Sequence, residues 1–275
     1  EASMPPLPPA TRPILWPAAG LLLGLTLAFG TALPALGQPA PPAGQDDPAA
    51  ATVDPPSRVG RLALLLGTVS FHTADQTDWQ AAVLNYPITS GNSLWTQPGA
   101  AAAIDVGAAH LVLDQATEFD LTTLDDTTLE ATQPQGAMYL RVRALADGDS
   151  YRITTPRGTV TILQPGAYEI IAGDANNPTI VTVVEGSARI DSTDASLTLG
   201  PKQAGRIQGD TNFAVSVFAA AYDPFLAARL AEEQVQARRP APAPAAAPPP
   251  VVAQMTGGAV LASTGSWATT PQYGH

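Results

Sequence analysis

The stretch from Tyr151 to Ile171 reads YRITTPRGTVTILQPGAYEII, and it decides the fold class. It holds three short runs in which apolar, β-branched or aromatic residues recur at every second position. Gly158 separates the first run from the second, and Pro165 with Gly166 separates the second from the third. Runs of this length, bounded by Gly and Pro, are typical of β-strands joined by tight turns. We therefore expect three consecutive strands here.

The same pattern continues on both sides of this stretch. Short apolar runs recur at intervals of roughly 8–12 residues, which is the spacing of an all-β sandwich, barrel or β-roll. The expected strand nearest the amino terminus, 62–73, contains Gly67, which we interpret as a bulge or a bend. The other expected strands are 62–73, 101–106, 110–113, 119–124, 127–132, 137–142, 179–185, 187–191, 196–199 and 204–207.

One helix is expected after the strands. Asp223 can cap it, and Pro224 suits its first position. Two stretches rich in Pro and Ala indicate disordered linkers. The expected organisation is a signal peptide (1–37), a disordered linker (38–57), a β domain (58–220), a helix (223–239), a Pro/Ala linker (240–254) and the start of a truncated second module (255–275).

The amino-terminal part resembles an export signal. Arg12 precedes an apolar segment at 15–33 that is mostly Leu, Ala and Gly. Ala35 and Gly37 then supply the small residues of a cleavage site, which predicts cleavage between Gly37 and Gln38. The alternative is a retained membrane anchor, since the apolar segment is about long enough to span a bilayer. Either outcome places the remainder of the chain outside the cytoplasm.

Composition excludes several function classes. The net charge of −11 argues against nucleic-acid binding, which needs a clustered basic surface. The chain has no cysteine and three histidines, so thiolate metal sites, Cys nucleophiles and His-based catalysis have little to draw on. His72 and His110 each fall in a strand-like run without a metal-binding motif around them. We expect no cofactor, no metal and no catalytic residue.

The acidic residues offer one enzymatic alternative. Residues 62–140 contain nine acids and no Lys or Arg, and we interpret them mainly as a solvated surface. A carbohydrate-active envelope enzyme would need two carboxylates of the 105–130 region to converge at about 5–9 Å. Asp125 and Asp126 are adjacent and would point to opposite faces of a strand, so a turn is the expected role. The Asp-rich turns near Asp149 and Asp174 lack the remaining ligands of a calcium loop.

The strand region is similar to a FecR domain in the order and spacing of its segments. The family pattern is one Gly-x-Val strand followed by short strands with a glycine at the turns. The matching segments are GTVSFH (67–72), YPITSGNSLWTQPGAAAAIDVGAAHLVLDQATEFDL (86–121), LEATQPQGAMYLRV (129–142), YRITTPRGTVTILQPGAYEII (151–171), TIVTVVEGSARI (179–190) and LTLGPKQAGRI (197–207). One departure is the sequence QPGA at 164–167, where the family often has Arg-Gly-Thr.

The resemblance implies an all-β periplasmic module in a Gram-negative bacterium. FecR proteins receive a signal from an outer-membrane transporter and control a sigma factor through a cytoplasmic part. Too few residues precede the apolar segment for that cytoplasmic part, so only the periplasmic module carries over. The tail MTGGAVLASTGSWATTPQYGH (255–275) resembles the opening of a module of unknown function that follows FecR domains in exported proteobacterial proteins.

The expected function is a non-catalytic, exported interaction module in envelope signalling or scaffolding. Its partner would be an unknown envelope protein or a cell-wall polymer. Nucleic acid is excluded, and membrane contact would come only through a retained amino-terminal segment. The alternatives are the carbohydrate-active envelope enzyme, a membrane-anchored signal-transduction subunit, and a secreted form of the same module.

Overall fold

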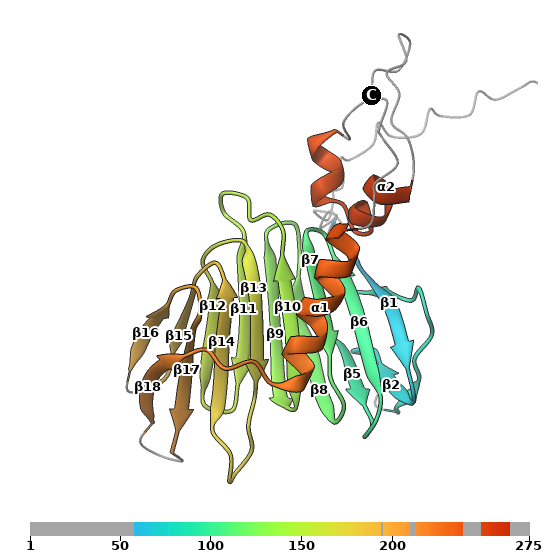
Figure 1. Ribbon diagram of the computed structural model, residues 1–275. Coiled ribbons are helices and arrows are strands. Elements are labelled where there is room, and N and C mark those ends of the chain that lie inside the picture. The colour runs from blue at the N-terminus through green and yellow to red at the C-terminus, as the bar shows by residue number, and fades with distance from the viewer. Residues whose placement is uncertain (1–57, 77, 194, 210–212, 239–248, 265–275) are drawn as a thin grey trace, which may run out of the picture. The chain divides into compact units, whose positions relative to one another are not determined.

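The computed structural model describes residues 58–264 except 77, 194, 210–212 and 239–248. The strands form two nine-stranded sheets, as expected for an all-β protein (Figure 1). Sheet A runs in the order β18 (Ala214–Ala219), β17 (Gln203–Gln208), β14 (Thr179–Glu185), β13 (Gly166–Ile171), β10 (Ala137–Val142), β7 (Ala109–Leu113), β6 (Ala101–Val106), β1 (Gly60–Leu66) and β4 (Pro87–Ile88). Sheet B runs in the order β16 (Ser196–Leu199), β15 (Ala188–Asp191), β12 (Gly158–Ile162), β11 (Ser150–Thr155), β9 (Thr128–Gln135), β8 (Thr117–Leu124), β5 (Asn92–Thr96), β2 (Val69–His72) and β3 (Gln80–Ala81).

The core lies between the two sheets. In β11, Tyr151 and Ile153 are buried while Arg152 and Thr154 are exposed, which is the alternation read from the sequence. Leu140 and Tyr168 supply the facing side chains from sheet A, and all four belong to one apolar cluster drawn from both sheets. Each fully buried aliphatic or aromatic side chain of this kind contributes roughly 1.5–3 kcal/mol. The confirmed fold class is therefore an all-β sandwich.

Glycine turns carry the chain from one sheet to the other. The expected single strand 62–73 is two strands, β1 in sheet A and β2 in sheet B, because Gly67 has a φ of +67° and turns the chain between them. Gly136, with a φ of +86°, makes the same passage from β9 to β10. A Cβ atom at Gly136 would collide with Thr117, so only glycine fits this turn.

The helix α1 (Pro224–Arg238) covers part of the outer face of sheet A (Figure 1). Asp223 caps it, accepting a hydrogen bond from the Leu226 N–H at 2.8 Å. Leu226 is fully buried and packs with Val112, Tyr139 and two alanines of sheet A. This part of sheet A is thus buried on both faces. The C-terminal helix expected from the sequence is confirmed.

Two short elements follow in the stretch that we expected to hold a linker and a second module. They are a 3₁₀ helix, η1 (Pro250–Gln254), and a seven-residue α-helix, α2 (Gly258–Thr264). The Thr256 hydroxyl between them donates to the Val59 carbonyl at 2.8 Å and accepts from the Gly107 N–H at 2.9 Å. No helix among the described residues is long and apolar enough to cross a membrane. The predicted cleavage site, Gly37 and Gln38, lies outside the described residues.

Candidate interaction site

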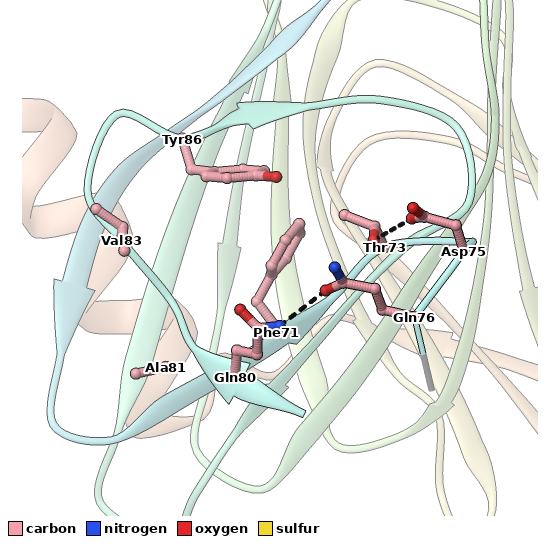
Figure 2. A pocket seen from close by; sticks show the side chains of 8 residues that line it. All are labelled: Phe71, Thr73, Asp75, Gln76, Gln80, Ala81, Val83 and Tyr86. Carbon is pink, nitrogen blue, oxygen red and sulfur yellow. Dashed lines mark hydrogen bonds between the residues drawn. The ribbon is translucent and has the colours of Figure 1, made fainter. Parts of the chain in front are cut away.

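A pocket lies at the edge of the sandwich where both sheets end in strands of two residues. β3 closes sheet B and β4 closes sheet A, and the space beside them is lined by β2, β3 and the loops that follow each of them. The cavity has a volume of about 330 Å³. We call it the corner pocket, and Figure 2 shows its lining residues: Phe71, Thr73, Asp75, Gln76, Gln80, Ala81, Val83 and Tyr86.

One side of the corner pocket is aromatic. The ring of Tyr86 lies 4.6 Å from that of Phe71, measured between centroids, and is tilted by 58° to it. Phe71 is 7% exposed and belongs to the core, whereas Tyr86 is 37% exposed. The backbone of Tyr86 is held in a turn, because its N–H donates to the Val83 carbonyl at 3.1 Å and its carbonyl accepts from the Leu62 N–H at 3.0 Å. The Tyr86 ring is therefore presented from a fixed backbone.

Asn85 makes this turn sharp. Its φ is +65°, a conformation that asparagine tolerates better than most residues. Its N–H donates to the Leu62 carbonyl at 2.8 Å, and its side-chain oxygen accepts from Arg61 at 2.9 Å. The turn is thus tied to β1 through both backbone and side chain.

The opposite side of the corner pocket is polar. The Thr73 hydroxyl donates to Asp75, and the Gln80 amide donates to the Gln76 side-chain oxygen at 2.8 Å (Figure 2). The hydrogen bond from Thr73 lowers the pKa of Asp75, so this carboxylate is ionised at neutral pH. Among the lining residues Asp75 carries the one charge. The pocket therefore offers amide and hydroxyl groups beside an acceptor, with no cation.

The far end of sheet A carries a second candidate surface, the outer edge of β18. β18 pairs one-to-one with β17 over its whole length, from Ala214 opposite Gln208 to Ala219 opposite Gln203. The Ala220 N–H donates to the Lys202 carbonyl at 2.9 Å, which places position 220 in a hydrogen-bonded pair. Since such pairs alternate along an antiparallel ladder, the backbone groups of 215, 217 and 219 point away from β17.

Nothing in the sequence of β18 blocks this edge. The strand reads AVSVFA, without charge, proline or bulge, which are the devices that protect most edge strands. Val217 is 46% exposed. Within the described residues β18 is paired on one side only, and β16 is likewise the last strand of sheet B at this end (Figure 1).

A buried carboxyl group lies under the first turn of α1. Glu169 of β13 is 1% exposed, and its Oε1 atom has no hydrogen-bond partner among the described residues. Burial raises the pKa of Glu169 to about 8, and the negative charge of Asp223 adds to the rise. Burial also raises the pKa of the nearby Asp114. Glu169 is therefore mostly protonated at neutral pH, sealed between sheet and helix.

The two histidines of the strand region have structural partners. The His72 ring packs edge-on against Trp79, with centroids 4.5 Å apart. His110 Nδ1 lies 2.7 Å from Asp105, whose other oxygen accepts from Arg61 at 2.8 Å. This pair was not expected from the sequence. It forms because the β6–β7 hairpin sets Asp105 directly opposite His110. In the part of the chain that the structure describes, no group of three metal-ligating side chains occurs.

Asp105 shows how pairing and burial compete. Burial by itself would raise the pKa of Asp105. The hydrogen bonds and charges of His110 and Arg61 lower this pKa by more than burial raises it. The net effect is a pKa below the ordinary value for aspartate. Asp105 is thus a charged member of a surface network on sheet A.

The acids of the 105–130 region are distributed over both sheets of the sandwich. Asp105 lies on the outer face of sheet A, while Glu118 and Asp120 lie on the outer face of sheet B, on the other side of the core. Asp125 accepts from the N–H groups of Thr127 and Thr128 at 2.9 and 2.7 Å, which makes it a turn residue as expected.

The two turns considered as calcium loops are closed by internal bonds. Asp174 accepts from the N–H groups of Asn176 and Asn177 at 2.7 and 2.9 Å. Asp149 accepts from the Ala146 N–H at 2.9 Å and from Arg58 at 3.2 Å. Their oxygen atoms organise the backbone of these turns.

Comparisons with known proteins give only distant similarities. No protein-family model matches the chain, and no curated protein matches it. Similar solved structures include two crystal structures of a putative anti-sigma factor from Parabacteroides distasonis ATCC 8503, each with a TM-score of 0.41 and with 15% and 14% sequence identity. Each match covers 46% of this chain and 59% of the other, so it spans less than two thirds of the neighbour.

Proposed function

We propose that this chain is a non-catalytic, exported interaction module of the FecR type that binds a protein of the bacterial envelope by strand addition. The observation that carries the proposal is the unblocked outer edge of β18. Three residues there, 215, 217 and 219, present backbone N–H and C=O groups away from β17. An extended segment of another protein can continue sheet A at this edge.

The side chains of β18 define the segment that fits. Val215 packs partly into the core, and Val217 is exposed beside it. The strand has no charged residue, so complementarity favours an extended segment with apolar side chains at alternate positions and few charges. Main-chain hydrogen bonds would supply the affinity, and contacts with the valine side chains would set the register of the added strand against β18.

The sequence supports the cellular setting. The apolar segment at 15–33 with its cleavage site predicts export, and the FecR resemblance from Gly67 to Ile207 implies the periplasm of a Gram-negative bacterium. The role would be in envelope signalling or scaffolding. A membrane-anchored form would keep residues 15–33, and sequencing the mature amino terminus separates it from the cleaved form.

The decisive experiment uses Val217→Pro in the full chain. Proline removes the outward N–H of residue 217 and leaves every β17–β18 hydrogen bond in place. The matched control is Val217→Thr, which keeps the N–H group. A photo-crosslinking amino acid at Ala219 then reports neighbours in the envelope of the native host. We expect an adduct with one envelope protein, retained in Val217→Thr and lost in Val217→Pro.

Two results would overturn the proposal. The same adduct at equal yield in Val217→Pro would show that strand addition at β18 is not the mode of binding. A reproducible hydrolase activity that one point substitution abolishes would show that the module is catalytic. Circular dichroism of both Val217 variants verifies that the sandwich is intact.

A further inference from the structure

The corner pocket lies at the opposite end of the sandwich from β18, and the proposed function does not use it. We propose that it is a binding site for one pyranose ring of a neutral glycan. This second site is independent of strand addition, since no residue is shared between them. Its size, its aromatic wall, its polar groups and its charge each restrict the ligand.

The dimensions suit a single ring. Ligand pockets in proteins span roughly 300–1,000 Å³, and the corner pocket of about 330 Å³ lies at the small end of that range. It opens at the edge of the sandwich beside β3 and β4, so further units of a polymer could extend into solvent. A chain-end or a mid-chain unit of a polysaccharide can therefore enter without threading through the protein.

The aromatic wall suits the apolar face of a sugar. A pyranose carries C–H groups on its ring faces and hydroxyl groups around its rim. The face of an aromatic ring is the negative part of its quadrupole, and it attracts the weakly positive C–H hydrogens. Tyr86 is the exposed aromatic residue of the lining, since its side chain is 37% exposed and its turn is fixed to β1. Figure 2 shows its ring across the pocket from Thr73 and Asp75.

The polar wall suits the hydroxyl rim. Sugar hydroxyls both donate and accept, and they need partners of both kinds. The Gln80 amide donates to the Gln76 oxygen at 2.8 Å, which orders both side chains before a ligand arrives. Within the described residues this leaves the amide hydrogens of Gln76 and the amide oxygen of Gln80 for a ligand. Asp75 adds a charged acceptor, which makes the stronger class of hydrogen bond.

The charge of the region selects neutral ligands. The lining residues include no Lys or Arg, and Asp75 is ionised. Phosphates, uronic acids and peptide carboxylates would meet the negative charge of Asp75 with no cation in the lining to offset it. A neutral sugar, with or without an N-acetyl group, carries no such penalty.

A proline-rich peptide is the competing ligand class, and the geometry disfavours it. Grooves for polyproline segments are lined by several exposed aromatic side chains. Here Phe71 is 7% exposed, and the two rings are tilted by 58°, so the pocket offers one exposed aromatic side chain rather than a slot between two. The hydrogen-bonding side chains opposite Tyr86 favour a ligand with many hydroxyl groups.

Calorimetric titration of the full chain with chitotriose in its N-acetylated form, and with cellotriose, tests the proposal. We expect one of these neutral trisaccharides to bind. Tyr86→Ala should weaken binding by about tenfold or more, because it removes the stacking face. Tyr86→Phe, which keeps the ring, should stay within about threefold of the wild type. The control Tyr222→Ala removes a tyrosine that is 43% exposed elsewhere, and it should leave affinity unchanged.

Three outcomes would overturn the glycan site. They are the absence of binding by both trisaccharides at millimolar concentration, equal affinity in Tyr86→Ala, and binding of an oligoproline peptide in place of either sugar. If Tyr86→Ala does not fold, as judged by circular dichroism, the double substitution Gln76→Ala and Gln80→Ala takes its place with the same expected loss. The Val217→Pro crosslinking result is independent, so failure of one site is distinguishable from failure of the other.

Discussion

The buried carboxyl of Glu169 makes the stability of this protein depend on pH near neutrality. Its ordinary pKa is 4.5, and burial with the nearby Asp223 raises it to about 8 in the folded state. Between these two values the folded protein holds a proton that the unfolded chain has released. The folded state thus binds more protons, and the free energy of unfolding must fall as pH rises through this window.

The expected magnitude follows from the two pKa values. Each pH unit of separation corresponds to about 1.4 kcal/mol, so the wild type should lose roughly 3–4 kcal/mol between pH 5 and pH 8. The loss should level off above pH 8, where both states are ionised. Asp114, whose pKa burial also raises, acts in the same direction. Thr182 opposes the effect by hydrogen bonding to Glu169, and the value of about 8 already includes it.

Glu169→Gln removes the ionisable group and keeps its size. We expect this variant to have a much flatter stability profile than the wild type from pH 5 to pH 8, with the contribution of Asp114 remaining, and to exceed the wild type by roughly 3–4 kcal/mol at pH 8. Urea denaturation at fixed ionic strength, followed by tryptophan fluorescence at half-unit pH steps, measures the profile. The control Glu232→Gln changes an acid on α1 whose side chain is 57% exposed, and it should keep the wild-type slope.

An equal pH slope in the wild type and in Glu169→Gln would refute this reasoning. It would mean that Glu169 is ionised in the folded state, or that water reaches it beneath α1. A slope of the opposite sign would mean that a paired carboxylate elsewhere dominates the titration.

Three further predictions concern the packing and the turns of the sandwich. Leu226→Ala should cost about 2–5 kcal/mol and should expose α1 to limited proteolysis, because it empties the contact with the outer face of sheet A. Gly136→Ala should lower stability by well over 1 kcal/mol in thermal denaturation, since its Cβ would meet Thr117, whereas Gly99→Ala, with positive φ and open space, should cost about 1 kcal/mol. Tyr168→Phe should cost about 1–3 kcal/mol by urea titration, because the hydroxyl accepts from the Ser187 N–H at 3.1 Å and donates to the Gln164 carbonyl; a loss near zero in any of these would contradict the assigned contact.

The local pattern of the sequence was sufficient for most of the strands and for the helix, but β5 and β18 were not among the expected strands. Tyr151 and Ile153 face the core because successive side chains of a strand point to opposite faces, and this period is visible in the residues alone. Asp223 and Pro224 marked the start of the helix, which the structure places at Pro224–Arg238. Strand alternation and helix capping each depend on residues a few positions apart, so these elements could be predicted without knowing any long-range contact.

The candidate sites were not visible in the same way. The corner pocket depends on β3 and β4, which have two residues each and carry too little pattern to be recognised. A single strand was expected at 62–73, but the chain passes from sheet A to sheet B at Gly67. The two halves of that stretch therefore belong to different sheets. The FecR resemblance covered Tyr86 and Phe71 but gave no indication that their rings meet.

The sequence by itself determined that this chain forms a stack of short strands, since alternating polarity and glycine turns act locally. Only the tertiary structure decided which strands end the sheets, which places a bare edge at β18 and a pocket at β3 and β4. It also decided that α1 seals Glu169 against sheet A. Those outcomes depend on pairing between segments far apart in the chain, where sheet order and burial are set by the whole core rather than by neighbouring residues.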